Sequence, residues 1–247
     1  MPDAAQLAIL FAVGSLAGVF NVMAGGGSTL TLPALIFLGL DAGTANGTNR
    51  VAILIQNISA TASFRAEGVS ELQTSLVLAL WTLPGAVAGA LAATRVSDAW
   101  FERILGIAMI GIVLSMVVPR PLKPEGVAGR RSAWMYPALF GIGFYGGFIQ
   151  MGVGLLFMAA FFHLMRTDLV RATVHKVLII LIYTLPTLVI FAFAGHVDWL
   201  MGLGLAAGNA TGGWFAARIA VRKGEKAVRA VLIAAILVMA VKILGLL

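Results

Sequence analysis

Eight long apolar segments constrain what this chain can fold into more than any other feature of its sequence. They cover residues 4–40, 44–64, 72–93, 100–118, 132–164, 169–194, 199–217 and 227–246. A helix that spans a bilayer needs about 20 consecutive apolar residues, and a soluble core cannot hold so many such segments. Only 11% of the residues are charged, compared with about 25% in an ordinary soluble domain. We therefore predict an all-α, polytopic protein of the inner (plasma) membrane.

Charge and composition exclude several functions. The formal net charge is +7, but the Lys and Arg residues lie mainly in short loops between apolar segments, where they set orientation. We therefore expect the lipid bilayer, and no nucleic acid, as a partner. The chain contains no Cys, which excludes disulfides, thiol chemistry and Cys-ligated metals. All ten Asp and Glu lie in loops, at segment ends or in a linker, so no span interior offers a carboxylate for a proton relay.

The motifs of common enzymes are absent from the sequence. It contains no GxSxG, HExxH or P-loop pattern, so we predict that the chain is not an enzyme and expect no cofactor or metal. Residues 1–10 lack the basic region of a cleavable signal peptide, and we expect none.

A hydrophilic linker, residues 119–131, divides the chain into two halves of the same layout. The first repeat covers residues 1–118 and the second covers residues 132–247. Each begins with a long segment broken by glycines and continues with three ordinary spans. Internal repeats of this kind are the usual architecture of secondary transporters.

Two local alignments support this division. Residues 24–28 lie opposite residues 150–154, and residues 45–50 lie opposite residues 171–176. The order of features is therefore the same in both halves, although the sequence similarity is weak.

The two glycine-broken segments, residues 4–40 and 132–164, are too long for one straight crossing. If both turn back as re-entrant hairpins, 13 of the 17 Lys and Arg residues face the cytoplasm, compared with 11 of the 17 if all eight segments cross. The positive-inside rule prefers the hairpins. We therefore predict six crossings, a cytoplasmic linker, and two inverted repeats that each contain one hairpin and three transmembrane helices. Eight crossings remain the alternative.

The glycine breaks are the first candidate site. Unwound backbone at membrane depth is tolerated where it is buried in protein or lines a cavity. The half-helix that follows each break has unpaired N–H groups and a positive dipole end, which favour an anion. Close helix packing is the alternative role of such glycines. The predicted binding residues here are Gly25, Gly26, Gly27, Ser28, Thr29, Gly152 and Gly154.

A polar stretch at the start of the segment 44–64 is the second candidate. Asn46, Thr48 and Asn49 can line a polar cavity, because three adjacent polar groups facing lipid would be costly. Arg50 can bind an anion bidentately or extend to the headgroups, and we leave both open. The opposite stretch offers Thr173 and His175, whose imidazole can take up or release a proton near neutral pH.

Two further features have structural interpretations. Lys176 follows His175, and we expect it to be an interface residue that sets topology. Gly85-x-x-x-Gly89 predicts a close-packing face, and that face could also support a homodimer.

The first repeat carries a recognisable signature. It consists of Ala24-Gly25-Gly26-Gly27-Ser28, then Pro33 and Leu35, then Leu38-Gly39-Leu40, then Ala45 with Gly47-Thr48-Asn49. This pattern resembles the sulfite exporter TauE/SafE family, and the similarity of layout covers nearly the whole chain. The second repeat departs from the signature, because Met151-Gly152-Val153-Gly154 stands where the triple glycine would be.

The resemblance implies a bacterial inner-membrane transporter for a sulfur-containing anion such as sulfite, sulfoacetate or another organosulfonate. We expect a secondary transporter that exports a small anion bound between the tips of the two hairpins, with alternating access by one repeat rocking against the other. An anion channel is one alternative. A membrane enzyme or assembly factor is another, although it would need a catalytic pair that the sequence does not contain.

Overall fold

The computed structural model describes residues 2–117 and 132–243, so the predicted linker at 119–131 lies outside the described residues. Every secondary-structure element in these ranges is helical, which confirms the all-α prediction. The elements are α1 (Ala4–Met23), α2 (Ser28–Phe37), α3 (Ala42–Ala66), α4 (Leu72–Ala93), α5 (Asp98–Val117), α6 (Met135–Phe148), α7 (Val153–Ala160), a π-helix η1 (Phe161–Met165), α8 (Leu169–Phe193) and α9 (Trp199–Ile243).

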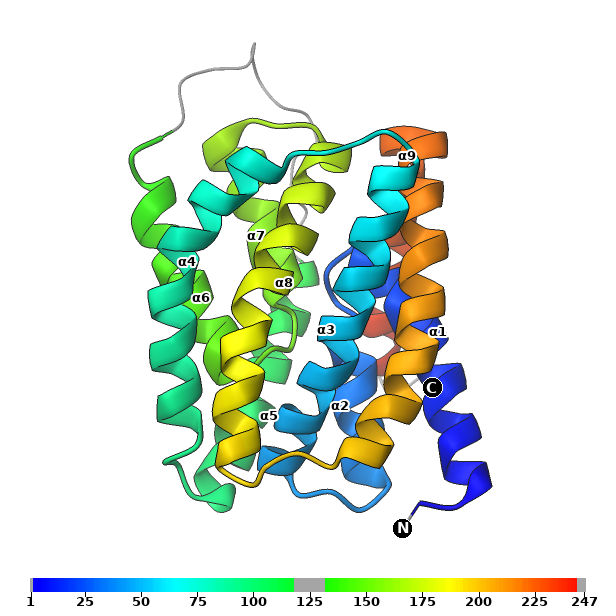
Figure 1. The fold of residues 1–247 in the computed structure, drawn as a ribbon, viewed down its shortest axis with the longest axis vertical. Helices are drawn as coiled ribbons and strands as arrows, with labels where there is room; N and C mark the ends of the chain where they lie inside the picture. Colours follow the sequence, from blue (N-terminus) through cyan, green and yellow to red (C-terminus); the bar gives the residue numbers. More distant parts are fainter. Residues whose placement is uncertain (1, 118–131, 244–247) are drawn as a thin grey trace.

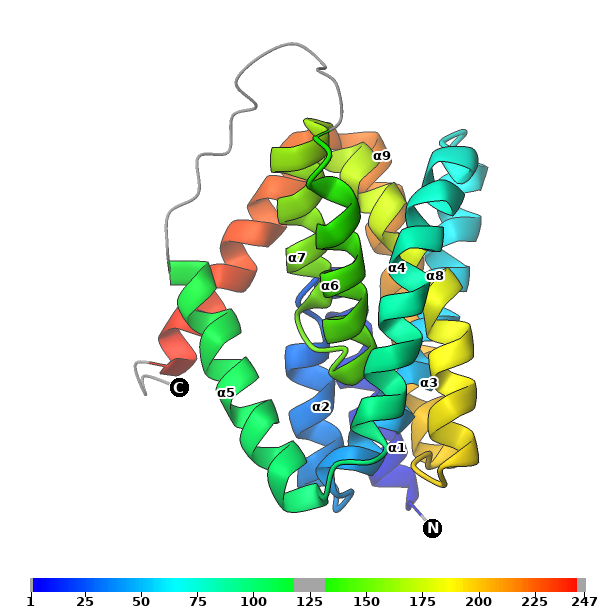
Figure 2. The same cartoon turned by 90° about the vertical axis from the view of Figure 1, so that its left-hand side faces the viewer.

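Each glycine-broken segment forms a hairpin of two helices. We call α1–α2 the first hairpin and residues 24–28 its tip; α6–α7 is the second hairpin, with residues 150–154 as its tip. Figure 1 and Figure 2 show that the two hairpins start from opposite ends of the bundle and that their tips lie near its middle. With ten residues, α2 is about 15 Å long, roughly half of a bilayer's hydrocarbon thickness.

The outer surface is apolar, as a membrane location requires. Phe37 and Phe193 are 91% and 89% exposed, and Leu80 and Ile107 are also largely exposed. By length and composition, α1, α4 and α8 are each able to cross a membrane. Exposed apolar surface of this extent is favourable in lipid and unfavourable in water. The arrangement of the hairpins agrees with the inverted repeats, whose orientation in the membrane stays a prediction.

Each hairpin packs against a helix of the other half through close glycine contacts. The first hairpin packs along α9 through α1, and the second packs along α4 through α6. A Cβ atom on Gly85 would overlap the carbonyl oxygen of Phe140, and one on Gly89 would overlap that of Phe144. The close-packing prediction for Gly85 and Gly89 is therefore confirmed. The suggestion that this face supports a homodimer is wrong, because α6 of the same chain occupies it.

The last two predicted spans, residues 199–217 and 227–246, belong to one element with a break. The backbone of α9 is non-helical at Gly224, where φ is 65° and ψ is −158°. Positive φ at this position favours glycine, because it has no Cβ to clash with the following carbonyl. The break divides α9 into two parts at one end of the bundle (Figure 2).

Candidate functional site

The two tips touch each other through their backbones. Gly25 has φ of 90° and Gly152 has φ of 69°, so both tips use the left-handed conformation that glycine adopts without strain. A Cβ atom on Gly154 would overlap the Cα atom of Gly25. The structure therefore brings the two predicted glycine breaks together, and in this conformation no space separates Gly25 from Gly154.

Each tip also presents unpaired backbone donors. Among the described residues, nothing accepts a hydrogen bond from the backbone N–H groups of residues 26–28 or 152–154. The next groups along are paired: Thr29 N–H donates to Gly26 O at 3.1 Å, and Leu155 N–H donates to Gly152 O at 3.0 Å. Both half-helices thus begin in the protein interior with free donors and a positive dipole end, which is an arrangement that favours an anion.

Asn46 and Arg50 lie one helical turn apart on α3 and hold the second hairpin. Asn46 Nδ2 donates to Phe148 O at 2.9 Å, and its Oδ1 accepts from Gln150 N–H at 3.4 Å. These bonds satisfy polar groups at the point where α6 ends. Asn46 is fully buried, and its amide fixes the second tip to α3 through these two hydrogen bonds.

Arg50 holds the C-terminal end of α6. Its Nη2 donates to Gly147 O at 2.6 Å, its Nη1 donates to Gly146 O at 3.3 Å and to Thr187 Oγ1 at 3.1 Å. The guanidinium carbon lies 4.3 Å from the centre of the Phe191 ring. Because Arg50 is 0% exposed, the headgroup interpretation is wrong. A cation at a helix C-terminus is electrostatically favourable, and carbonyls are a usual partner of intramembrane cations.

Lys176 makes the equivalent contact in the other half. Its Nζ donates to Asn21 O at 3.0 Å and also to Val22 O, both at the C-terminal end of α1. Only 1% of Lys176 is exposed, so the expectation that it lies at the interface is wrong. Arg50 and Lys176 were opposite each other in the sequence alignment, and each one binds the hairpin of the other half.

Asn49 holds the first hairpin from α3. Its Oδ1 accepts from Thr31 Oγ1 at 2.7 Å, and its Nδ2 donates to Ser28 Oγ at 3.3 Å. Thr29 Oγ1 donates to Gly26 O at 2.6 Å and so closes the tip on itself. The polar stretch at the start of α3 therefore contacts both hairpins. Thr48 is different, because its hydroxyl accepts from Asp198 N–H at 2.9 Å just before α9.

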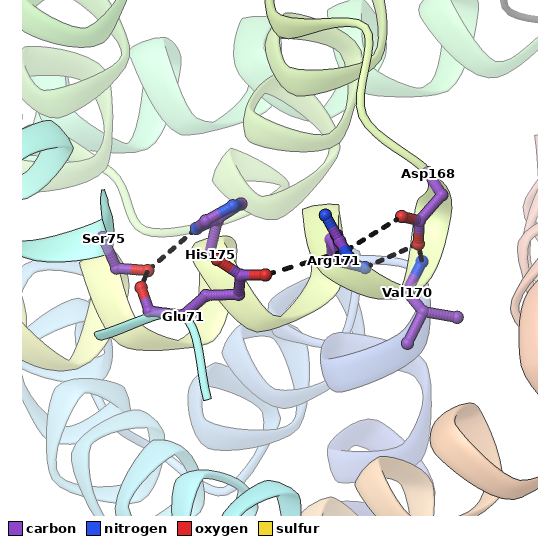
Figure 3. A network of polar contacts seen from close by, with 6 residues as sticks. All are labelled: Glu71, Ser75, Asp168, Val170, Arg171 and His175. Atoms are coloured by element: carbon purple, nitrogen blue, oxygen red, sulfur yellow. Dashed lines mark hydrogen bonds and ion pairs between the residues drawn. The ribbon is translucent and has the colours of Figure 1, made fainter. Parts of the chain in front are cut away.

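The structure places Thr173 and His175 toward the start of α8. Thr173 Oγ1 donates to Leu169 O at 2.8 Å within its own helix. His175 Nδ1 lies 2.9 Å from Ser75 Oγ of α4. Figure 3 shows this pair beside Arg171, which lies between the carboxylates of Glu71 and Asp168 at 3.6 and 3.5 Å. His175 thus contacts α4, and its ring centre also lies 5.8 Å from that of Phe161 in η1.

Several functional candidates went unnoticed in the sequence. Thr31 and Gln150 contact the polar stretch of α3 directly, and Thr184 Oγ1 accepts from Gln150 Nε2 at 3.0 Å. Tyr183 is fully buried beside them. Polar residues inside spans are a signal that could have found them, but their partners lie on other helices. Within the described part of the chain, His, Asp and Glu form no group of three that could hold a metal ion.

Comparison with known proteins gives one family. The sequence profile described as "Sulfite exporter TauE/SafE" matches residues 10–243. The chain is 32% identical over 245 residues to a "Probable membrane transporter protein ORF9" of Sinorhizobium sp, covering 97% of this chain and 92% of the relative. It is 31% identical over 240 residues to the "Probable membrane transporter protein YfcA" of Escherichia coli K12, covering 96% and 89%. No solved structure matches the chain.

Proposed function

This chain belongs to the sulfite exporter TauE/SafE family, and we propose that it is a secondary transporter of a small sulfur-containing anion. Family membership confirms two predictions: the chain is a multi-pass membrane transporter and is not an enzyme. The proposed part is the substrate, which is an anion such as sulfite or an organosulfonate, together with its site and the direction of transport.

The observation that carries the proposal is an interior with positive charge and no counter-charge. Arg50 and Lys176 are both buried, and no Asp or Glu is buried among the described residues. The N-terminal ends of α2 and α7 add two positive dipole ends at the touching tips. Charged groups are costly at membrane depth and mark ion pathways. An anion between the tips would be attracted by all four groups.

The free backbone donors supply the direct contacts in this proposal. The N–H groups of residues 26–28 and 152–154 would donate to the oxygen atoms of the anion, and Ser28 would add a hydroxyl. Arg50 and Lys176 already donate to carbonyls, so they contribute charge and hold the tips in place. The relatives' names give no substrate, and the sulfur chemistry comes to this chain from the family's description alone.

Transport follows from relative movement of the two halves. Gly25 and Gly154 are in contact, so binding between the tips requires them to separate. Rocking of one repeat against the other would open the tips, and the bonds that Arg50 and Lys176 make to the hairpin of the other half would change during this movement. A monovalent anion that leaves a cell with a negative interior gains about 2.3 kcal/mol per 100 mV, which favours export without a coupling ion.

We propose that the anion enters at a cavity at one end of the bundle. It lies between α3, α4 and α8, where Arg65 is exposed and would attract anions. Its lining consists of Thr61, Phe64, Arg65, Val69, Ser70, Leu72, Val174 and Leu178. The end of the bundle that carries this cavity is the one that we predict to face the cytoplasm.

The proposal is tested by flux measurements in proteoliposomes. Purified protein is reconstituted, and uptake of sulfite, sulfoacetate, acetate and chloride is measured with and without a pH gradient. We expect saturable flux of the sulfur anions that exceeds flux of acetate at least tenfold. Flux that rises linearly with concentration would indicate a channel, and absence of flux for both sulfur anions would overturn the substrate class.

A further inference from the structure

Three buried polar atoms near the second tip have no hydrogen-bond partner among the described residues. They are Arg50 Nε, Gln150 Oε1 and Tyr183 Oη. The three side chains are at most 2% exposed. Such atoms are rare in native proteins, and each one costs stability unless a partner arrives. The other buried unpartnered atoms among the described residues belong to the neutral side chains Gln56, Thr61 and Asn209 of α3 and α9.

The three residues surround one place, where α6 ends against α8. Arg50 donates to the carbonyls of Gly146 and Gly147. A Cβ atom on Gly146 would lie 2.8 Å from Tyr183 Oη, so this hydroxyl lies against the same turn. The Tyr183 hydroxyl also interacts electrostatically with Arg50 and lies within side-chain hydrogen-bonding range of the Gln150 amide. The unpartnered atoms thus belong to one cluster beside the second tip.

The chemistry of this cluster suits an oxyanion. Arg50 Nε–H is a donor with no acceptor among the described residues, and the Tyr183 O–H lies near the Gln150 amide without forming a hydrogen bond of good geometry in this conformation. Gln150 can present a third donor, because turning its amide by 180° places Nε2 where Oε1 now lies. The Thr184 hydroxyl, which now accepts from Nε2 at 3.0 Å, would then donate to Oε1. Three donors, one of them on a cation, match the oxygen atoms of a sulfite or sulfonate group.

A purely structural role explains the cluster poorly. Phenylalanine in place of Tyr183 would fill the same space and would remove one unpaired hydroxyl from the interior. The first half does not repeat the Gln–Tyr pair at the aligned positions, because the sequence alignment places Ala24 opposite Gln150 and Asn57 opposite Tyr183. The Asn57 amide already donates to Ile53 O at 2.7 Å in its own helix. The first half has a buried unpaired donor of its own, Gln56 Nε2, but the group of a cation, a phenol and an amide without partners occurs, among the described residues, at the second tip.

We propose that Tyr183 and Gln150, together with Arg50 Nε, bind the oxyanion group of the transported anion at the second tip and determine its specificity. This inference rests on the proposed transport function. It makes the site asymmetric: both tips supply backbone donors, the first adds the Ser28 hydroxyl, and the second adds side-chain donors that bind the oxygen atoms. Binding accompanies separation of Gly25 from Gly154.

The test compares Tyr183→Phe and Gln150→Leu with wild-type protein in proteoliposomes. We expect each variant to raise KM for sulfite about tenfold, as loss of a hydrogen bond to a charged group would. The thermal stability of Tyr183→Phe should equal or exceed that of wild type, because the hydroxyl it loses is unpaired. Tyr136→Phe is the matched control, since Tyr136 packs on Trp81 with ring centres 4.9 Å apart; its KM should not change.

The outcomes separate this inference from the proposed function. Wild-type vesicles that carry neither sulfite nor sulfoacetate would overturn the proposed function and, with it, this inference. Wild-type flux together with an unchanged KM in Tyr183→Phe would overturn the inference alone. If Tyr183→Phe does not fold, Gln150→Leu decides: a raised KM supports the site, and a wild-type KM overturns it.

Discussion

The first hairpin is held by Lys176 of α8, and the second by Arg50 of α3. Both cations bind carbonyls at the end of the hairpin's first helix. Each half therefore supplies the cation that holds the hairpin of the other half. The linings differ. The first tip ends at Ser28 and is followed by the hydroxyls of Thr29 and Thr31, whereas the second tip ends with Val153 and Gly154.

This difference teaches that the two hairpins are held in the same way although the residues around their tips differ. The cation that fixes each hairpin is a requirement of the membrane interior, because water cannot satisfy the helix-end carbonyls there. The residues around the tips do not have to pair these carbonyls, so they can differ between the two halves. Asn46 and Asn49 brace both hairpins from α3, while α8 carries Ala172 and His175 at the corresponding positions. The first three predictions below test this comparison, and the fourth tests a contact outside the hairpins.

The largest expected effect is an all-or-none difference in labelling. The chain has no Cys, so Leu40→Cys before α3 and Thr167→Cys before α8 introduce unique thiols. If the halves are inverted repeats, these turns lie on opposite faces of the membrane. We expect a membrane-impermeant maleimide to label only one of them in right-side-out vesicles. Labelling of both from one side would contradict the inversion, and labelling after detergent lysis controls for accessibility.

Gly154→Ala should break the contact between the tips. The added Cβ atom would overlap the Cα atom of Gly25, and we expect a loss of about 3 kcal/mol in the free energy of unfolding together with loss of flux. Gly141→Ala is the matched control on α6, because nothing lies within 4 Å of its Cβ position. Equal melting temperatures of the two variants in detergent would show that the tips do not need this contact.

Loss of each cation should reveal how similar the two halves are. Arg50→Met leaves two carbonyls and the Thr187 hydroxyl without a donor, and Lys176→Met leaves two carbonyls. At about 1 kcal/mol or more for each freed group, Arg50→Met should lower the melting temperature more than Lys176→Met. Both should reduce anion flux at least tenfold. The exposed Arg103→Met is the control, and a larger loss in Lys176→Met would refute the ranking.

The smallest effect is expected at the end of the bundle where α3 meets α9. Glu67 accepts from Arg218 and Arg222, each at 2.9 Å, and these hydrogen bonds, that of Arg222 foremost, hold the pKa of its carboxyl below the ordinary value of 4.5. A lowered pKa in the folded state means that the stabilisation is present above pH 4.5 and is lost as the pH falls through the folded-state pKa.

Melting curves from pH 7 down to pH 3 check this prediction. Wild-type protein should lose this contribution on acidification, and Glu67→Gln should be less sensitive to pH over the same range. High salt should reduce the difference between the two proteins, because the pair is near the surface. A pH dependence that is identical in both would show that Glu67 does not contribute.

The sequence alone predicted the helical class, the positions of the glycine breaks and the family. These follow from properties that are local along the chain: the length of an apolar run, the poor helix propensity of consecutive glycines, and a signature of closely spaced residues. The extents of α4 and α8 agreed closely with the predicted spans. The break in α9 at Gly224 was predicted only as a gap between two spans.

Only the tertiary structure decided what the polar side chains bind. Arg50 and Asn49 are adjacent in sequence, yet one holds the second hairpin and the other holds the first. Thr48, the residue before Asn49, instead accepts a hydrogen bond from the backbone N–H of Asp198, just before α9. Successive residues on a helix point in directions about 100° apart, so neighbours face different helices. Which helices these are depends on packing between segments far apart in the chain, and no local pattern records it.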